Sequence, residues 1–216
     1  MADMSGERAP EQYEFKHAEY VPYLIGKEGD LAFQASQGKY DPETQEFIAW
    51  NDKIKRVDDK GNVTIELVPT TGFGTTSKST SGFTVKEGQR TPLYVANMAL
   101  DQEIDARAKR LKKLGVPDKY LNNERTKAAI LSLDFNLGID GTDALKALKK
   151  GNIEEFKFYA FHPSKEAGNT YLLNNKGLRD RRQDELNLFE EGLSEIKKAG
   201  GGMVMRNYYD YEPRSI

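Results

Sequence analysis

Glu28 is the acidic side chain of this 216-residue chain whose position most favours proton-transfer chemistry. The segment EFKHAEYVPYLIGKEG predicts a helix that ends near Glu28, with Gly29 as its stop signal. A carboxylate at the C-terminal end of a helix is disfavoured by the negative end of the macrodipole, and partial burial also raises its pKa. A carboxyl group that keeps its proton near neutral pH can act as a general acid. The alternative interpretation is a surface glutamate in a charged chain.

The segment PTTGFGTT, residues 69–76, is the second candidate for chemistry. Gly72 and Gly74 flank an aromatic residue and allow the backbone to approach a ligand closely, while the neighbouring threonine hydroxyls can hold a water molecule. A phosphate loop is disfavoured because no Gly-Lys-Ser/Thr follows. The alternative is an ordinary junction between a strand and a turn.

The third candidate is KGLRDRRQDELNLF, residues 176–189. Arg181 and Arg182 lie at the apolar edge of the predicted last helix, where a guanidinium can reach a carboxylate on another element. The alternative is a solvated helix face on which both arginines pair with Glu185.

Turn signals and strand-like runs indicate the elements that position the first two candidates. Between residues 30 and 90, the runs EFIAW and NVTIELV, with the hairpin-type turn DKGN between them, predict a small antiparallel sheet. The Ser/Thr/Gly-rich run at residues 75–89 predicts an exposed loop.

Helical periodicity dominates the rest of the chain. Thr91-Pro92 predicts the cap and first position of a long amphipathic helix that ends at Gly115. Four further helices are predicted, over residues 123–137, 142–151, 153–161 and 178–200. A sheet and a helical bundle at opposite ends of a long helix predict two lobes with separate cores and a cleft between them, where ligands bind.

Composition excludes several classes of function. The chain has no cysteine, so disulfides, thiolate chemistry and cysteine-based metal sites are excluded. His17 and His162 are far apart in the sequence, which argues against a histidine-centred metal site. With 32 basic and 34 acidic residues, the net charge of −2 provides no overall field for nucleic acid or an anionic membrane. No apolar run approaches the ~20 residues of a membrane-spanning helix, and residues 1–12 lack a signal-peptide apolar region.

Five motifs, in this order, resemble the phage-type lysozymes, the muramidase endolysins of glycoside hydrolase family 24. YLIGKEG resembles the family's helix that ends in the catalytic Glu-Gly, and PTTGFGT is similar to its Thr-Ile-Gly-Tyr-Gly-His segment. TVKEGQRTPLYVANMALDQEIDARAKRL is similar to its turn followed by the long connecting helix. KAAILSLDFNLGIDG and KGLRDRRQDELNLF resemble its helices with Phe-Asn-x-Gly and Gly-Leu-x-x-Arg-Arg-x-x-Glu. The resemblance covers roughly residues 18–193.

The resemblance implies an α+β, lysozyme-like two-lobe fold, in which a long helix joins a small antiparallel β subdomain to a helical lobe. We expect a lysozyme-like domain over residues 15–200, between a flexible tail at 1–14 and a C-terminal tail at 201–216. Within the domain, the β-rich lobe is expected over about 29–90 and the helical lobe over about 91–200.

The resemblance also implies roles for individual residues. Glu28 would be the general acid, and Thr70 would help to hold the attacking water, with Thr71 as the next candidate. Arg181 would pair with the catalytic glutamate. The implied saccharide contacts, on opposite walls of the cleft, are Phe135 and Asn136, and Gly72 and Phe73.

The second catalytic carboxylate has two candidates. Glu28 and Thr70 are farther apart than the corresponding pair of the family, and no Tyr-x-Asp stands at the expected place between them. Asp58, before a glycine turn, matches best, and Asp41, in Lys-Tyr-Asp, is its rival. Thr75 stands where the family has a histidine.

The implied function is an inverting N-acetylmuramidase that cleaves the β-1,4 bond between N-acetylmuramic acid and N-acetylglucosamine, without metal or organic cofactor. A lytic transglycosylase, which needs only the acid, stays open, as does a non-enzymatic virion structural or cell-wall-binding protein. The expected partner is bacterial peptidoglycan, with other virion proteins in the last case. Nucleic acid, membrane insertion and oligomers are not expected. The expected location is the host cytoplasm before lysis, or the virion.

Overall fold

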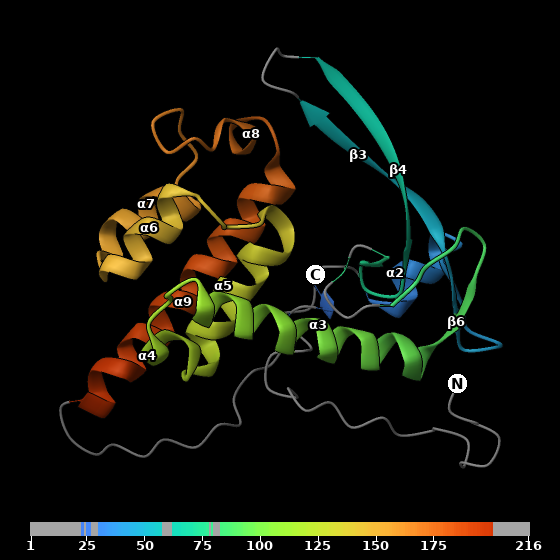
Figure 1. Ribbon diagram of the computed structural model, residues 1–216, viewed down its shortest axis with the longest axis horizontal. Helices are drawn as coiled ribbons and strands as arrows, with labels where there is room; N and C mark the ends of the chain where they lie inside the picture. The colour runs from blue at the N-terminus through green and yellow to red at the C-terminus, as the bar shows by residue number, and fades with distance from the viewer. Residues whose placement is uncertain are drawn as a thin grey trace.

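The computed structural model describes residues 23, 25–26, 30–57, 62–77, 79 and 83–200. In Figure 1 the strands and the short helix α2 (Leu31–Ser36) lie at one end of α3 (Leu93–Lys113), and the other helices gather at its opposite end. The strands are β1 (Tyr40–Asp41), β2 (Glu46–Ile48), β3 (Trp50–Val57), β4 (Val63–Thr71), β5 (Thr75–Thr76) and β6 (Arg90–Pro92). The remaining described helices are α4 (Asp118–Leu121), α5 (Glu124–Leu137), α6 (Asp143–Lys150), α7 (Ile153–Phe161), α8 (Thr170–Leu173) and α9 (Lys176–Gly200).

The described strands form two antiparallel sheets of three strands each, with the orders β1-β2-β6 and β3-β4-β5. The longest pairing joins β3 to β4, from Trp50 opposite Thr70 to Val57 opposite Val63. The predicted antiparallel pairing is present, but most of the run EFIAW forms β2, which pairs with β1 and β6. Only its last residue, Trp50, pairs with β4. Residues 58–61, which contain most of the predicted turn and Asp58, lie outside the described residues.

The long helix α3 begins one residue later than predicted. Pro92 is its N-cap and Leu93 its first residue, so the prediction of Thr91 as the cap is wrong. Thr91 lies in β6 instead, opposite Phe47 of β2, and its hydroxyl oxygen accepts a hydrogen bond from Thr71. The pairing of β6 with β2 therefore overrides the local capping pattern.

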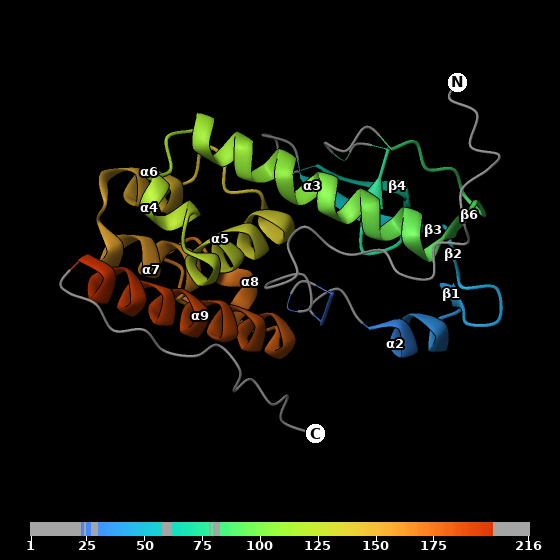
Figure 2. The same cartoon turned by 90° about the horizontal axis from the view of Figure 1, so that it is seen from below.

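Local signals define the helices of the bundle. The side chains of Asn123 and Thr142 accept hydrogen bonds from backbone N–H groups in the first turns of α5 and α6. Gly138 and Gly151 end the same helices with positive φ. These boundaries confirm the predicted ones, whereas the short helices α2, α4 and α8 are absent from the prediction. Figure 2 shows α5 lying along α9, the pair of helices that make the most extensive contact in the bundle.

One hydrophobic cluster extends from the strands to the bundle. Tyr40, Phe47 and Phe73 pack in series at the strand end, with ring centroids 5.0 and 5.1 Å apart. Ala96 and Leu100 of α3 belong to the same cluster, which continues along this helix into α5, α6, α7 and α9. The expectation of two separate cores is therefore wrong, because α3 buries side chains against both groups of elements.

Candidate active site

Two cavities adjoin the C-terminal end of α5. The smaller, of about 80 Å³, lies where the turn between β4 and β5 meets α3 and α5. Its lining residues are Phe73, Gly74, Thr75, Ser79, Leu100, Glu103, Arg107 and Phe135. The larger, of about 390 Å³, lies between the end of α5, the start of α6, part of α7 and the loop at 165–169. The last turn of α5 thus has open space on two sides.

The threonines predicted to hold water are both buried. The Thr70 hydroxyl donates to the carbonyl oxygen of Val68 at 3.0 Å, and the Thr71 hydroxyl donates to Thr91 Oγ1 at 3.2 Å. In both hydroxyls the oxygen lone pairs stay available to accept a hydrogen bond.

The predicted strand-side wall, Gly72 and Phe73, packs mainly against the protein itself. Gly72 has φ +59°, and a Cβ at this position would lie 2.9 Å from the Cβ of Ala96 on α3. The absence of a side chain at Gly72 therefore allows α3 to pack closely against the turn. The sequence predicts instead that this glycine allows the backbone to approach a ligand. Phe73 is buried against Phe47 and also lines the smaller cavity.

The two residues predicted for the opposite wall have different neighbours. Phe135 lines the smaller cavity together with Phe73, and the guanidinium carbon of Arg107 lies 4.2 Å from the centroid of its ring. Asn136 is exposed, and its side-chain oxygen accepts a hydrogen bond of 2.6 Å from Arg182 Nη2. The structure therefore brings Phe135 to Phe73 and joins Asn136 to α9.

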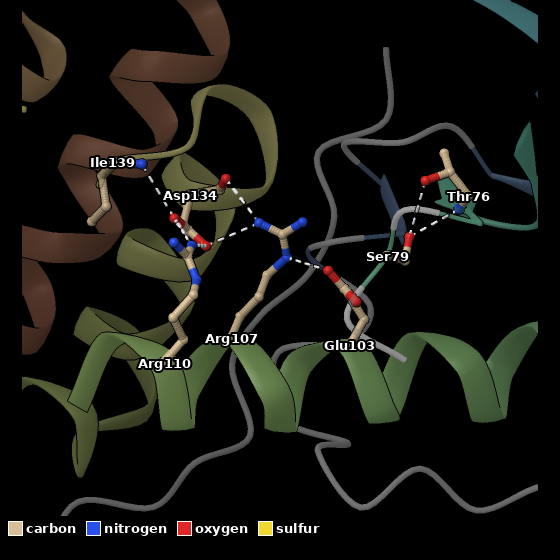
Figure 3. Close-up of polar contacts among 7 residues, drawn as sticks. All are labelled: Thr76, Ser79, Glu103, Arg107, Arg110, Asp134 and Ile139. Atoms are coloured by element: carbon tan, nitrogen blue, oxygen red, sulfur yellow. Dashed lines mark hydrogen bonds and ion pairs between the residues drawn. The ribbon is translucent and has the colours of Figure 1, made fainter. Parts of the chain in front are cut away.

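A buried carboxylate holds the last turn of α5 against α3 (Figure 3). Asp134 accepts hydrogen bonds from Arg107 Nη1 at 2.9 Å, from Arg110 Nη2 at 2.5 Å, and from the backbone N–H of Ile139 at 3.2 Å. Arg107 also donates to the Asp134 carbonyl oxygen, at 3.0 Å, and to Glu103 Oε1, at 2.6 Å. Sequence reasoning missed this cluster, because its members come from two helices.

A second buried carboxylate, Glu185, joins α5 to α9. Ser132 Oγ donates to Glu185 Oε1 at 2.6 Å, Arg181 Nε donates to the same oxygen at 3.2 Å, and Arg182 Nη1 donates to Oε2. Burial raises the pKa of the Glu185 carboxyl group, and the attraction of Arg182 only partly offsets this effect. Burial is the main reason that the pKa of Tyr23 is raised, and the negative charge of Glu185 adds to this effect. Tyr23 therefore lies near this cluster.

The Glu185 cluster bears on the prediction for Arg181. Its proposed partner, Glu28, lies outside the described residues, so the structure does not test that pair. The alternative pairs of Arg181 and Arg182 with Glu185 are present. Arg182 and Glu185 are buried and Arg181 is half-buried, whereas the sequence suggests a solvated helix face.

Of the two candidate aspartates, Asp41 is described by the structure and Asp58 lies outside the described residues. Asp41 accepts hydrogen bonds from Arg90 at 3.1 Å and from the backbone N–H of Glu43 at 3.0 Å, and the Arg90 contact is the main reason that its pKa is lowered. Val57, the residue before Asp58, lies seven ladder positions from the pair that contains Thr70, which is about 23 Å along a strand. Asp41 is therefore occupied by contacts within its own sheet, and the structure does not test Asp58.

Asp52 is an acidic residue that sequence reasoning missed. Trp50 lies directly opposite Thr70, and alternation along β3 puts the side chain of Asp52 on the same face of the sheet. The indole N–H of Trp50 donates to Asp52 Oδ1 at 2.7 Å. The available signal was Trp50-Asn51-Asp52, an aromatic-x-Asp segment in place of Tyr-x-Asp.

The family described as phage lysozyme matches residues 53–185, well over half of the sequence. The chain belongs to the phage lysozyme family. No curated protein and no solved structure matches the chain.

Membership in the phage lysozyme family makes the chain a glycoside hydrolase of the peptidoglycan-cleaving type, related to bacteriophage lysozymes. It also confirms the resemblance and the lysozyme-like α+β fold inferred from the sequence. The matched residues include Thr70, Phe135 and Arg181, but both Glu28 and Asp52 precede them.

Two further observations concern only the part of the chain that the structure describes. There, no group of three or more histidine, aspartate or glutamate side chains is arranged to hold a metal ion. Within the same residues, no helix is both long and apolar enough to cross a membrane.

Proposed function

We propose that this phage lysozyme is an N-acetylmuramidase that hydrolyses the β-1,4 bond between N-acetylmuramic acid and N-acetylglucosamine. The family match carries the proposal, because it includes the turn between β4 and β5 and the end of α5, which face each other across the smaller cavity. Hydrolysis by inversion needs a proton donor on the leaving oxygen and a second group that activates water on the other face of the sugar ring.

Glu28 is our proposed proton donor. Tyr23 and Ile25, which precede it in the sequence, pack against the core, and Tyr23 lies near Glu185. This packing supports the proposal, because a carboxyl group close to a buried surface keeps its proton at a higher pH than one in water. Arg181, which the resemblance pairs with the catalytic glutamate, and Arg182 lie in the Glu185 cluster. In this proposal their positive charge would stabilise the carboxylate left after proton transfer.

Asp52 and Thr70 are our proposed pair for the attacking water. The β3–β4 register supports this choice, since both residues lie on one face of the sheet at the base of the hairpin. The exposed Asp52 carboxylate has an indole hydrogen bond that fixes its orientation, and the Thr70 hydroxyl oxygen can accept a proton of the same water. The proposal therefore replaces Asp58 with Asp52.

In its biological setting we propose that the enzyme serves a bacteriophage, in host lysis or in entry. Both roles require only cleavage of peptidoglycan, which is the activity that the family supports.

The test compares turbidity loss of purified peptidoglycan by the wild type and by Glu28→Gln, Asp52→Asn and Asp58→Asn. Glu28→Gln keeps the shape and removes the transferable proton, so we expect a loss of about 10²-fold or more. We expect Asp52→Asn to fall in the same range and Asp58→Asn to keep wild-type activity. Asp118→Asn is the matched control, because Asp118 is exposed and pairs only at the surface with Lys112.

Each departure from this pattern has a distinct meaning. A large loss for Asp58→Asn with none for Asp52→Asn would restore Asp58 as the second carboxylate. Products with a 1,6-anhydro end would identify a transglycosylase. A folded wild type that clears nothing would favour the structural or cell-wall-binding alternative.

A further inference from the structure

The last turn of α5 contains a buried acidic side chain, that of Asp134, which takes no part in the proposed reaction. Asp134 is almost fully buried, yet it accepts hydrogen bonds from two arginines of α3 and from the backbone N–H of Ile139. Arg110 Nη2 lies 2.5 Å from both of its carboxylate oxygens. A carboxylate buried with this many donors is held in one orientation, because each lost donor would leave part of its charge unpaired.

Arg107 connects this carboxylate to the wall of the smaller cavity. One side of its guanidinium donates to Glu103 and the other to Asp134, so that its plane is fixed from both ends (Figure 3). The same guanidinium lies 4.2 Å from the ring centroid of Phe135. An arginine at this distance attracts the face of an aromatic ring and restricts its motion.

The opposite side of the same turn is held by α9. Ser132 donates to Glu185, and Arg182 joins Glu185 to Asn136. Phe135 thus lies on a segment whose neighbours at 132, 134 and 136 are all tied by hydrogen bonds to other helices.

We propose that Asp134 is a positioning residue for saccharide binding: by fixing Arg107 it fixes the Phe135 ring at the cavity, and so sets affinity for glycan without taking part in bond cleavage. The inference rests on the proposed function for the identity of the ligand. The positioning itself follows from the contacts among Asp134, Arg107 and Phe135.

The experiment is a double-mutant cycle with Asp134→Asn, Phe135→Leu and the double variant, using soluble glycan strands prepared from peptidoglycan. For Asp134→Asn we expect KM to rise about tenfold while kcat stays within about twofold, because only binding is weakened. If Asp134 acts through Phe135, the double variant has the KM of Phe135→Leu alone. Asp118→Asn is the control and leaves both constants unchanged.

Several results would overturn the inference. A fall in kcat at unchanged KM would mean that Asp134 acts in the chemical step, and additive effects on KM would mean that it does not act through Phe135. Unchanged constants in a folded Asp134→Asn variant would also refute it. If that variant does not fold, Arg107→Gln removes the link between Asp134 and Phe135 from a partly exposed position, and the inference requires that it raise KM in the same way.

A failure of the proposed function gives a different result. In that case the wild type itself releases no product. Binding by the wild type and the three variants is then measured as the fraction of each protein that pellets with insoluble peptidoglycan. Asp134→Asn must then weaken pelleting of a folded protein, and equal pelleting of the wild type and the variant would overturn the inference.

Discussion

Asp134 and Glu185 are each the centre of a cluster with two arginines, and the two clusters lie on opposite sides of α5. They differ in how far their arginines are exposed to water. Each is a buried carboxylate bound by two arginines. The arginines of Glu185 precede it on α9, and the side chain of Arg182 is only 1% exposed. The arginines of Asp134 come from α3, and their side chains are 20% and 33% exposed. A guanidinium that keeps contact with water can be hydrated again when its partner is lost, whereas Arg182 cannot.

The largest effect that we expect from this difference is on stability. Glu185→Ala should lower the free energy of unfolding by about 3–5 kcal/mol, because it leaves a buried guanidinium without a counter-charge. Asp134→Ala should lower it by about 2 kcal/mol, because Arg107 and Arg110 recover hydration but the N–H of Ile139 does not. Urea unfolding of the two variants and the wild type measures both values.

The opposite ranking would contradict the comparison. Equal losses of unfolding free energy in the two variants would mean that the exposure of the arginines does not determine the cost of removing their partner.

A smaller effect concerns pH. Burial raises the pKa of Glu185 above its ordinary value of 4.5, so the folded state binds a proton here more tightly than the unfolded state. The stability from this group is therefore complete below the unfolded pKa and is lost as the pH rises through the raised pKa. Subtracting the unfolding free energy of Glu185→Gln from that of the wild type isolates this group. We expect the difference to fall as the pH rises from about 4, following the titration of the carboxyl group. A difference that grows with pH would mean that the arginines outweigh burial.

The smallest effect serves as the reference for both clusters. Asp118 pairs with Lys112 at 3.0 Å, and both side chains are more than half exposed. Asp118→Asn should change the free energy of unfolding by less than about 0.5 kcal/mol, since exposed ion pairs contribute little. Raising the salt concentration should reduce even that difference, which urea unfolding at two ionic strengths measures.

The same contrast explains what the sequence could and could not predict. Caps such as Thr142 and stops such as Gly151 depend on neighbours within one turn, and their helices were predicted with the observed boundaries. Arg181 and Arg182 lie four and three residues before Glu185, so their pairs with it could be predicted as an alternative, but the burial of this cluster depends on α5.

Features that depend on long-range contacts were missed. That Asp52 and Thr70 lie on one face of the sheet follows from the β3–β4 register, which short motifs do not specify. Thr91 has good capping chemistry, but its pairing with β2 prevents it from capping α3. The ion pairs of Asp134 join residues 24 and 27 positions apart, on helices whose crossing the sequence does not reveal.

The single core along α3 has a consequence for how the molecule unfolds. Phe47 and Phe73 at the strand end share buried contacts, through Ala96 and Leu100, with side chains of the bundle. Removing the strands would expose one face of this helix, and melting the bundle would expose its continuation, so neither end retains its packing alone. We therefore expect the amide protons in the middle of α3 to exchange with solvent only when the whole molecule unfolds, as one cooperative unit.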